Sequence, residues 1–156
     1  MSARRRRTAP SRKHAPPRPE VYTTRSEEET IRLAERLART FGGREVVLLT
    51  GELGAGKTIF AKGLASGAGV RDVHRVCSPT FTLVNVYEGN HRIFHIDLYR
   101  LEDQDEILDL GWEDFLDEGI VIIEWAEKMA RPPAGIRVVI ETGPAGERTI
   151  TVTRED

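Results

Sequence analysis

The sequence predicts an α/β fold in which a mainly parallel central sheet is flanked by helices and carries antiparallel edge strands. Residues 51–58 form a glycine-rich loop between an apolar segment and a helical one. Residues 119–124 form another continuous apolar run, which is typical of a buried parallel strand. Two pairs of alternating segments, joined by turns at 88–90 and 143–146, indicate hairpins and therefore antiparallel pairing.

The chain begins its folded part with a short strand and an amphipathic helix. Residues 21–24 favour the strand, and Ser26 stands three residues before Glu29, which is a capping-box pattern for a helix start. The glycine pair 42–43 ends that helix. Its apolar face is expected to consist of Ile31, Ala34, Leu37, Ala38 and Phe41.

The most informative segment follows an apolar strand at 46–50 and precedes a helix at 58–66. It fits the phosphate-loop pattern G-x-x-x-x-G-K-[ST] with the residues Gly51, Glu52, Leu53, Gly54, Ala55, Gly56, Lys57 and Thr58. The glycines allow the backbone N–H groups to wrap a chain of phosphates, and the helix N-terminus adds its dipole. Lys57 would then contact the β- and γ-phosphates, and Thr58 would bind Mg²⁺. The strand–loop–helix order favours a P-loop NTPase-like fold over a glycine-rich turn with an ordinary lysine.

The remaining elements continue this sheet with hairpins and helical connections. Residues 67–79 are irregular, and the hairpin after them is an insertion behind the first strand–helix unit. The further elements expected are strands at 81–87 and 92–97, an acidic helical stretch at 101–116 broken at Gly111, a strand at 119–124, a short helix ended by Pro132 and Pro133, and strands at 136–141 and 148–153.

Two acidic residues end apolar strands and are candidate metal ligands. Asp97 ends the strand 92–97, and Glu124 ends the strand 120–124. A phosphate loop needs a carboxylate to complete the Mg²⁺ shell, and the carboxyl ends of parallel strands meet at the edge where ligands bind. Either acid alone could be a helix cap or a surface ion pair. Beside a phosphate loop, it is less expected that both are bystanders.

Three other side chains are candidates with an alternative each. Thr80, in the irregular segment 78–81, either senses the γ-phosphate and the metal, as switch segments do, or is a turn hydroxyl. Trp125 is either a site residue or a core aromatic. Arg148 either contacts phosphate or base or faces solvent. No N-K-x-D guanine-reading segment occurs, so ATP is favoured over GTP.

Composition indicates one domain without a membrane span. The chain has 156 residues, 39% of them hydrophobic, and no apolar run approaches membrane-spanning length. Its one cysteine, Cys77, excludes an internal disulfide and fits a reducing compartment, so a cytoplasmic protein is expected.

The charge is distributed unevenly along the chain. Residues 1–20 hold seven Arg or Lys, one Glu and four prolines, whereas residues 21–156 carry a net negative charge. We expect 1–20 to be a disordered basic tail and 21–156 to be a single P-loop ATPase domain. The tail is either a solvated segment or an arm that contacts RNA, tRNA included.

Four motifs together resemble, in order and spacing, the bacterial TsaE (YjeE) family. They are residues 51–58 (GELGAGKT), 78–84 (SPTFTLV), 95–100 (HIDLYR) and 123–127 (IEWAE), and the resemblance covers about residues 22–153. It implies an ATPase of the tRNA threonylcarbamoyladenosine pathway that assembles with TsaD and TsaB, the pair that transfers the threonylcarbamoyl group. It also implies slow hydrolysis by the isolated protein and a reset of the complex by ATP hydrolysis.

The resemblance also implies roles for individual residues. Residues 51–58 would hold ATP, Lys57 its phosphates, and Thr58 and Glu124 the Mg²⁺ ion. Asp97 would lie beside the γ-phosphate, in the metal shell or positioning a water. The remaining roles implied are a switch threonine at Thr80, a cover of the nucleotide site at Trp125, and an adenine-side contact at Arg148.

Without the resemblance, the residues support phosphoryl transfer to water, and two other functions stay open. A small-molecule kinase would share the loop and the acids but would need an arginine-rich lid, whereas residues 101–118 are acidic. A nucleotide-gated adaptor would use ATP binding, not hydrolysis, to control association.

Overall fold

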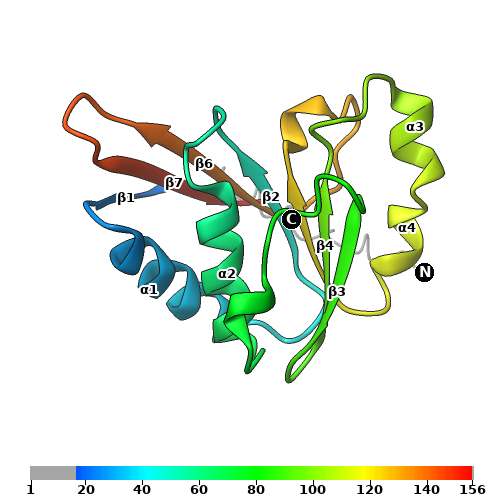
Figure 1. Ribbon diagram of the computed structural model, residues 1–156, viewed down its shortest axis with the longest axis horizontal. Helices are drawn as coiled ribbons and strands as arrows, with labels where there is room; N and C mark the ends of the chain where they lie inside the picture. Colours follow the sequence, from blue (N-terminus) through cyan, green and yellow to red (C-terminus); the bar gives the residue numbers. More distant parts are fainter. Residues whose placement is uncertain (1–16, 156) are drawn as a thin grey trace, which may run out of the picture.

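The computed structural model describes residues 17–155 and contains a seven-stranded sheet in the order β1-β7-β6-β2-β5-β4-β3 (Figure 1). Strands β6, β2, β5 and β4 pair in parallel, and the antiparallel pairs lie at the two edges. This confirms the predicted sheet. The strands are β1 (Glu20–Thr24), β2 (Val46–Thr50), β3 (Val84–Glu88), β4 (Arg92–Asp97), β5 (Ile120–Glu124), β6 (Ile136–Thr142) and β7 (Arg148–Arg154).

Helices cover both faces of the sheet, and Figure 1 shows α1 and α2 side by side, away from α3 and α4. The α-helices are α1 (Glu27–Ala38), α2 (Lys57–Gly67), α3 (Gln104–Asp109) and α4 (Trp112–Phe115). Two short 3₁₀ helices, η1 (Val73–Arg75) and η2 (Ala126–Lys128), complete the connections. Across residues 17–155, no helix combines the length and the apolar character needed to span a membrane.

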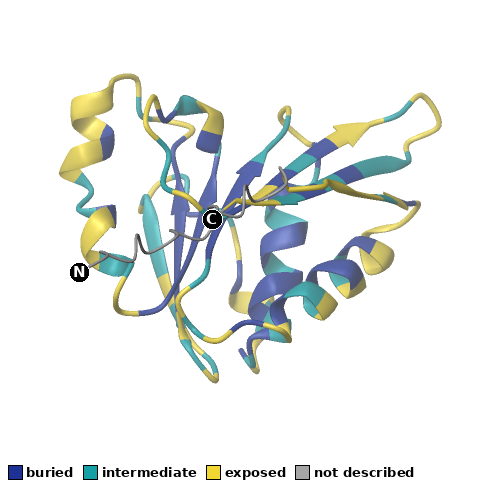
Figure 2. Cartoon of the chain, turned by 180° about the vertical axis from the view of Figure 1, so that it is seen from behind, coloured by how far each residue is buried: buried dark blue, intermediate teal, exposed yellow. Residues whose placement is uncertain are grey.

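Alternate residues of the central strands enter two separate cores. In β2, Val47 and Leu49 pack in the core that holds α1 and α2, while Val46 and Leu48 pack in the core that holds α3 and α4. Because both faces are covered, the central strands are buried along their length (Figure 2). This explains why they read in the sequence as continuous apolar runs and not as alternating ones.

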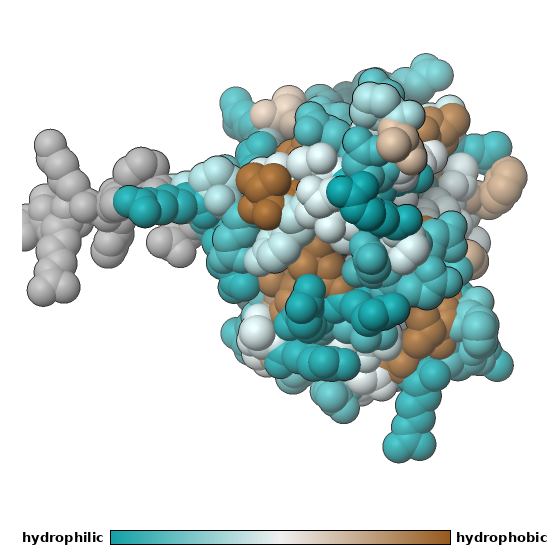
Figure 3. Space-filling model, turned by 90° about the vertical axis from the view of Figure 1, so that its left-hand side faces the viewer, coloured by the Kyte–Doolittle hydropathy of each residue, from teal (hydrophilic) through white to brown (hydrophobic). Residues whose placement is uncertain are grey.

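Helix α1 begins at the expected cap. The Ser26 hydroxyl accepts a hydrogen bond from the Glu29 N–H at 3.1 Å, while the Glu29 carboxylate accepts from the Arg25 N–H at 2.7 Å, one residue before the cap. The outer face of α1 is charged, and Figure 3 shows a mainly hydrophilic surface on this side, with apolar side chains in small separate patches. The helix is therefore amphipathic, as predicted. Ala34, Leu37, Ala38 and Phe41 pack in or against the core as expected, but Leu33 is in the core and Ile31 is not.

Helices α1 and α2 approach each other closely because α2 carries glycine at two facing positions. A Cβ atom at Gly63 would lie 2.5 Å from the Ile31 carbonyl oxygen, and one at Gly67 would lie 2.4 Å from the Glu35 carbonyl oxygen. Both distances are shorter than a real side chain allows. The glycines therefore permit the close packing of α2 against α1.

The sequence predictions differ most from the structure in three places. Strand β3 begins at Val84, not at residue 81, because Leu83 has a left-handed conformation (φ 67°) and the preceding residues turn. The helix expected before Pro132 is only the single turn η2. Strand β1 begins at Glu20, the last residue of the predicted tail, and residues 1–16 of that tail lie outside the described part of the chain.

Candidate nucleotide-binding site

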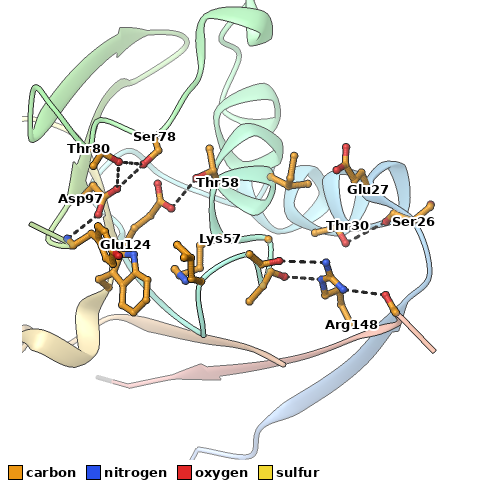
Figure 4. A pocket seen from close by; sticks show the side chains of 18 of the residues that line it. Ser26, Glu27, Thr30, Lys57, Thr58, Ser78, Thr80, Asp97, Glu124 and Arg148 are labelled. Atoms are coloured by element: carbon orange, nitrogen blue, oxygen red, sulfur yellow. Dashed lines mark hydrogen bonds between the residues drawn. The ribbon is translucent and has the colours of Figure 1, made fainter. Parts of the chain in front are cut away.

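The predicted site residues converge where the carboxyl ends of three strands meet the N-terminus of α2. The sheet register aligns Leu49 of β2, Glu124 of β5 and Asp97 of β4. Beside them is a cavity of about 580 Å³, shown in Figure 4. It is lined, among others, by residues 53–58, Thr80, Asp97, Glu124, Trp125 and Arg148. Gly51 and Glu52 instead line a neighbouring cavity of about 760 Å³.

The loop before α2 has the backbone form of an anion cradle. Gly54 and Gly56 have φ values of 77° and 108°, conformations that other residues adopt only with strain. Gly56 is the N-cap of α2 and offers no side chain to the first-turn N–H groups. These groups and the helix dipole therefore stay available to an anion in the cavity.

Lys57 brings a buried positive charge to this loop. Lys57 is only 5% exposed to solvent. Its Nζ donates hydrogen bonds to the carbonyl oxygens of Gly51 at 2.6 Å and Glu52 at 2.8 Å. Nζ also lies 4.0 Å from the centroid of the Trp125 ring. Burial lowers the pKa of Lys57 from its usual 10.5, while nearby carboxylates, Glu127 first, oppose the shift.

Thr58 and Glu124 contact each other directly, as Figure 4 shows. The Thr58 hydroxyl donates to Oε1 of Glu124 at 2.9 Å, which joins the start of α2 to the end of β5. The second carboxylate oxygen, Oε2, lies 2.5 Å from Nε2 of His95. Sequence reasoning did not include His95 in the site. The sequence clue to His95 is its position two residues before Asp97, because side chains two apart on a strand lie on the same face.

Asp97 holds the segment after η1 in place. Its Oδ2 accepts hydrogen bonds from the hydroxyls of Ser78 at 2.5 Å and Thr80 at 3.1 Å, and its Oδ1 accepts from the Tyr99 N–H at 2.9 Å (Figure 4). Ser78 is a second side chain that sequence reasoning missed as a site residue. Thr80 does reach the site, and its role as a switch residue stays a prediction.

Trp125 and Arg148 contact different parts of the phosphate loop. Trp125 follows β5 in a left-handed conformation (φ 59°), which turns its ring toward Lys57 and toward Tyr99, 5.0 Å away between centroids. Arg148 donates from Nε to the Ala55 carbonyl at 2.7 Å and from Nη2 to the Gly54 carbonyl at 3.3 Å. Arg148 therefore braces the loop; an adenine contact stays a prediction.

A family comparison agrees with this arrangement of motifs. The model described as "Threonylcarbamoyl adenosine biosynthesis protein TsaE" matches residues 24–150, which include all four motifs. The chain belongs to the TsaE family. Its P-loop NTPase-like fold also agrees with a solved structure: the crystal structure of YdiB from Bacillus subtilis matches with a TM-score of 0.68 and 30% identity, over 90% of this chain and 88% of that one.

Proteins named tRNA threonylcarbamoyladenosine biosynthesis protein TsaE are similar over nearly the whole folded part. The one from Aquifex aeolicus is 43% identical over 131 residues, which is 83% of this chain and 92% of that protein. The one from Nostoc sp. is 41% identical over 132 residues, 81% and 80% of the two chains. The one from Bacillus subtilis is 38% identical over 136 residues, 85% and 84%.

The donor set of this TsaE-family site fits Mg²⁺ and not a softer metal. In the described chain, no cluster of three or more His, Cys, Asp or Glu is placed to hold an ion by itself. A hydroxyl, Thr58, and two strand-end carboxylates, Glu124 and Asp97, instead offer hard oxygen donors. Mg²⁺ is typically held by one or two such groups together with waters and substrate phosphates, so this incomplete shell suits it.

Proposed function

We propose that this chain is an Mg²⁺-dependent ATPase that acts with TsaD and TsaB in tRNA threonylcarbamoyladenosine biosynthesis. The observation that carries the proposal is the convergence of a buried cation and oxygen donors on one cavity at the start of α2. Lys57, Thr58, Glu124 and Asp97 all line it. The pathway follows from the name that the relatives carry and is assigned on that basis alone.

Binding of the phosphates is the task of the loop. The first-turn N–H groups of α2 and the Lys57 ammonium provide fixed positive charge at the cavity. Ordering the loop for ATP binding should cost little free energy, because Arg148 and the carbonyl contacts of Lys57 already hold it in place. Arg148 fixes the carbonyl groups of Gly54 and Ala55, and Lys57 fixes those of Gly51 and Glu52.

Metal binding and water positioning are assigned to the start of α2 and the ends of β4 and β5. Thr58 and Glu124 would hold Mg²⁺, which when bound neutralises charge on the phosphates. Asp97, fixed by Ser78, Thr80 and the Tyr99 N–H, would complete the metal shell or orient the attacking water. Hydrolysis by such a site depends mostly on positioning and charge stabilisation.

A partner would complete the site. Two arginines line the cavity, Arg25 and Arg148, and the second is already bonded to loop carbonyls. Phosphoryl-transfer sites commonly receive an additional positive group from a partner protein. This arrangement predicts slow hydrolysis by the isolated chain and acceleration by TsaD–TsaB.

The test measures Mg²⁺-dependent ATP hydrolysis by the chain alone and with TsaD–TsaB. We expect low activity alone, higher activity with the partners, and loss of activity in Lys57→Ala and Glu124→Ala. Lys62→Ala, also on α2 but outside the cavity lining, is the matched control and should behave as the parent.

Three results would contradict this proposal in whole or in part. Hydrolysis that ignores TsaD–TsaB would remove the pathway assignment. ADP formation only with a small-molecule acceptor would indicate a kinase. Asp97→Ala that loses hydrolysis but keeps full partner association and full support of tRNA modification would indicate a nucleotide-gated adaptor.

A further inference from the structure

His95 is a fully buried polar residue that the proposed chemistry does not use. It is 0% exposed, lies in the middle of β4, and is paired through Nε2 with Oε2 of Glu124 at 2.5 Å. Glu124 is itself only 2% exposed. Its two oxygens therefore have different partners: Thr58 on Oε1 and His95 on Oε2.

The hydrogen-bonding needs of the ring define what His95 supplies. With the Glu124 carboxylate as the acceptor, Nε2 carries the proton that joins the pair. The other nitrogen, Nδ1, is buried and has no hydrogen-bond partner among residues 17–155. A proton on Nδ1 would leave a buried donor unsatisfied. A ring with its proton on Nε2 therefore fits these contacts.

We infer that His95 is a positioning residue that fixes the Glu124 carboxylate for Mg²⁺ at the nucleotide site. The inference rests on the proposed function, because it assigns a use to Glu124 as a metal ligand. A Glu side chain can rotate about three bonds, and hydrogen bonds to both oxygens hold its carboxylate plane in one orientation. Without His95, Oε2 would be a buried acceptor with no partner in its present place, and the carboxylate would reorient.

The position of His95 agrees with this role. On β4 it lies two residues before Asp97, and in the sheet register it is next to Ile122 of β5, two residues before Glu124. His95, Asp97 and Glu124 therefore lie on one face of adjacent strands, His95 in the core and the two acids at the cavity. The partners that orient a metal ligand commonly change metal affinity or activity roughly 10- to 100-fold when they are removed.

The experiment compares two substitutions in the full chain. His95→Gln keeps an N–H donor at about the reach of Nε2, whereas His95→Leu fills similar space without a donor. The readout is the dissociation constant of a fluorescent ATP analogue with Mg²⁺ and with EDTA. We expect His95→Leu to reduce the tightening caused by Mg²⁺ by roughly 10-fold or more, with little change in EDTA, and His95→Gln to retain most of it.

Two controls separate positioning from general destabilisation. His74→Leu, at an exposed histidine, should match the parent. In a Glu124→Ala background, His95→Leu should cause no further loss of the Mg²⁺ effect, because His95 acts through Glu124. Nitrogen-15 NMR of histidine-labelled protein should place a proton on His95 Nε2.

The outcomes distinguish this inference from the proposed function. A full Mg²⁺ effect in His95→Leu would overturn the positioning role alone. Equal losses with Mg²⁺ and with EDTA in both variants, together with a lower melting temperature, would make His95 purely structural and overturn it too. An Nε2 that carries no proton would contradict the assigned contact. If Mg²⁺ does not tighten ATP binding by the parent chain, the proposed function fails and the positioning role fails with it.

Discussion

Lys57 combines burial with positive charge, two properties that oppose each other in a folded protein. Desolvation favours the neutral amine, and this is why its pKa is lowered from 10.5. Two carbonyl oxygens and the Trp125 ring compensate in part. The charge is held where phosphates would use it, so the loop accepts a cost in stability to preserve a binding group.

The lowered pKa of Lys57 predicts opposite effects of rising pH on ATP affinity and on the stability of the ligand-free protein. Above this pKa the lysine loses its charge, so ATP affinity should fall, by about tenfold per pH unit if only the charged form binds. The fall should begin at a lower pH than an ordinary lysine would give. Between the folded pKa and 10.5 the unfolded chain binds more protons, so the contribution of Lys57 to ligand-free stability rises with pH.

The measurement is ATP affinity from pH 7 to 10, with urea unfolding of the ligand-free parent and Lys57→Met over the same range. The affinity of Lys57→Met should be weak and independent of pH. The stability difference between the two proteins should move in favour of the parent as the pH rises. ATP affinity of the parent that stays constant up to pH 10 would contradict a lowered pKa for Lys57.

Among single residues of the site, those that belong to a local sequence pattern could be predicted. Those that reach the site only through tertiary contacts could not. Lys57 and Thr58 are part of a fixed motif, and Asp97 and Glu124 end recognisable strands. Ser78 is an ordinary turn hydroxyl until the fold places it 2.5 Å from Asp97, 19 positions away.

Between elements, Arg148 connects the β6–β7 hairpin to the phosphate loop. One guanidinium donates to the carbonyls of Gly54, Ala55 and Gly146, so it bridges two segments more than 90 residues apart. The planar fork of Arg can make these bonds together, whereas the single ammonium of Lys cannot. The hairpin thereby stabilises a loop that its glycines leave flexible.

Arg148→Lys should therefore weaken ATP binding without unfolding the protein. Loss of one hydrogen bond from a charged donor costs about 1.5 kcal/mol, which corresponds to about a tenfold weaker affinity. Calorimetric titration of ATP measures it, with Arg154→Lys on the same strand as the control, since Arg154 is exposed. An unchanged affinity in Arg148→Lys would mean that the loop keeps its form without the brace.

The contact between α1 and α2 is the second inter-element feature with a measurable consequence. Gly63→Ala would force a Cβ atom against the Ile31 carbonyl. Overpacking costs about 1–3 kcal/mol, and the intrinsic helix preference of Ala over Gly returns at most about 1 kcal/mol. We expect a net loss of stability in urea unfolding. Gly42→Ala, where an added Cβ would meet only the Glu45 carboxylate at an ordinary 3.9 Å, should be close to neutral, and a stabilised Gly63→Ala would show that the helices can separate at little cost.

Element boundaries were predicted where a residue type enforces them and missed where backbone geometry does. The glycine break at Gly111 is present as the left-handed N-cap of α4. The start of β3 was wrong because a positive φ at Leu83 is not a property of leucine; tertiary contacts impose it. The Leu83 carbonyl accepts the Asp97 N–H at 3.0 Å, which holds the turn against β4.

At the scale of the whole molecule, the fold class was predictable and the strand order was not. Buried runs and hairpin turns indicate which strands are parallel and which are antiparallel. They do not indicate that β2 lies between β5 and β6, or that the β3–β4 hairpin extends the sheet beyond β5. That order brings the carboxyl ends of β2, β5 and β4 together. The site is thus a property of topology, assembled from four motifs that the sequence keeps apart.

Because the cavity joins α2, the ends of β4 and β5, and the β6–β7 hairpin, a ligand there should stabilise the entire fold. A ligand at about 100 times its dissociation constant adds about 2.7 kcal/mol. For a chain of this size, that corresponds to an increase of roughly 5–11 °C in melting temperature. The measurement is thermal unfolding with ATP and Mg²⁺, with ATP and EDTA, and without ligand. The parent and Lys62→Ala should show the full increase, EDTA should reduce it, and Lys57→Ala should abolish it. An equal increase in Lys57→Ala would mean that ATP binds elsewhere on the molecule, since a ligand stabilises the native state only through the groups that hold it.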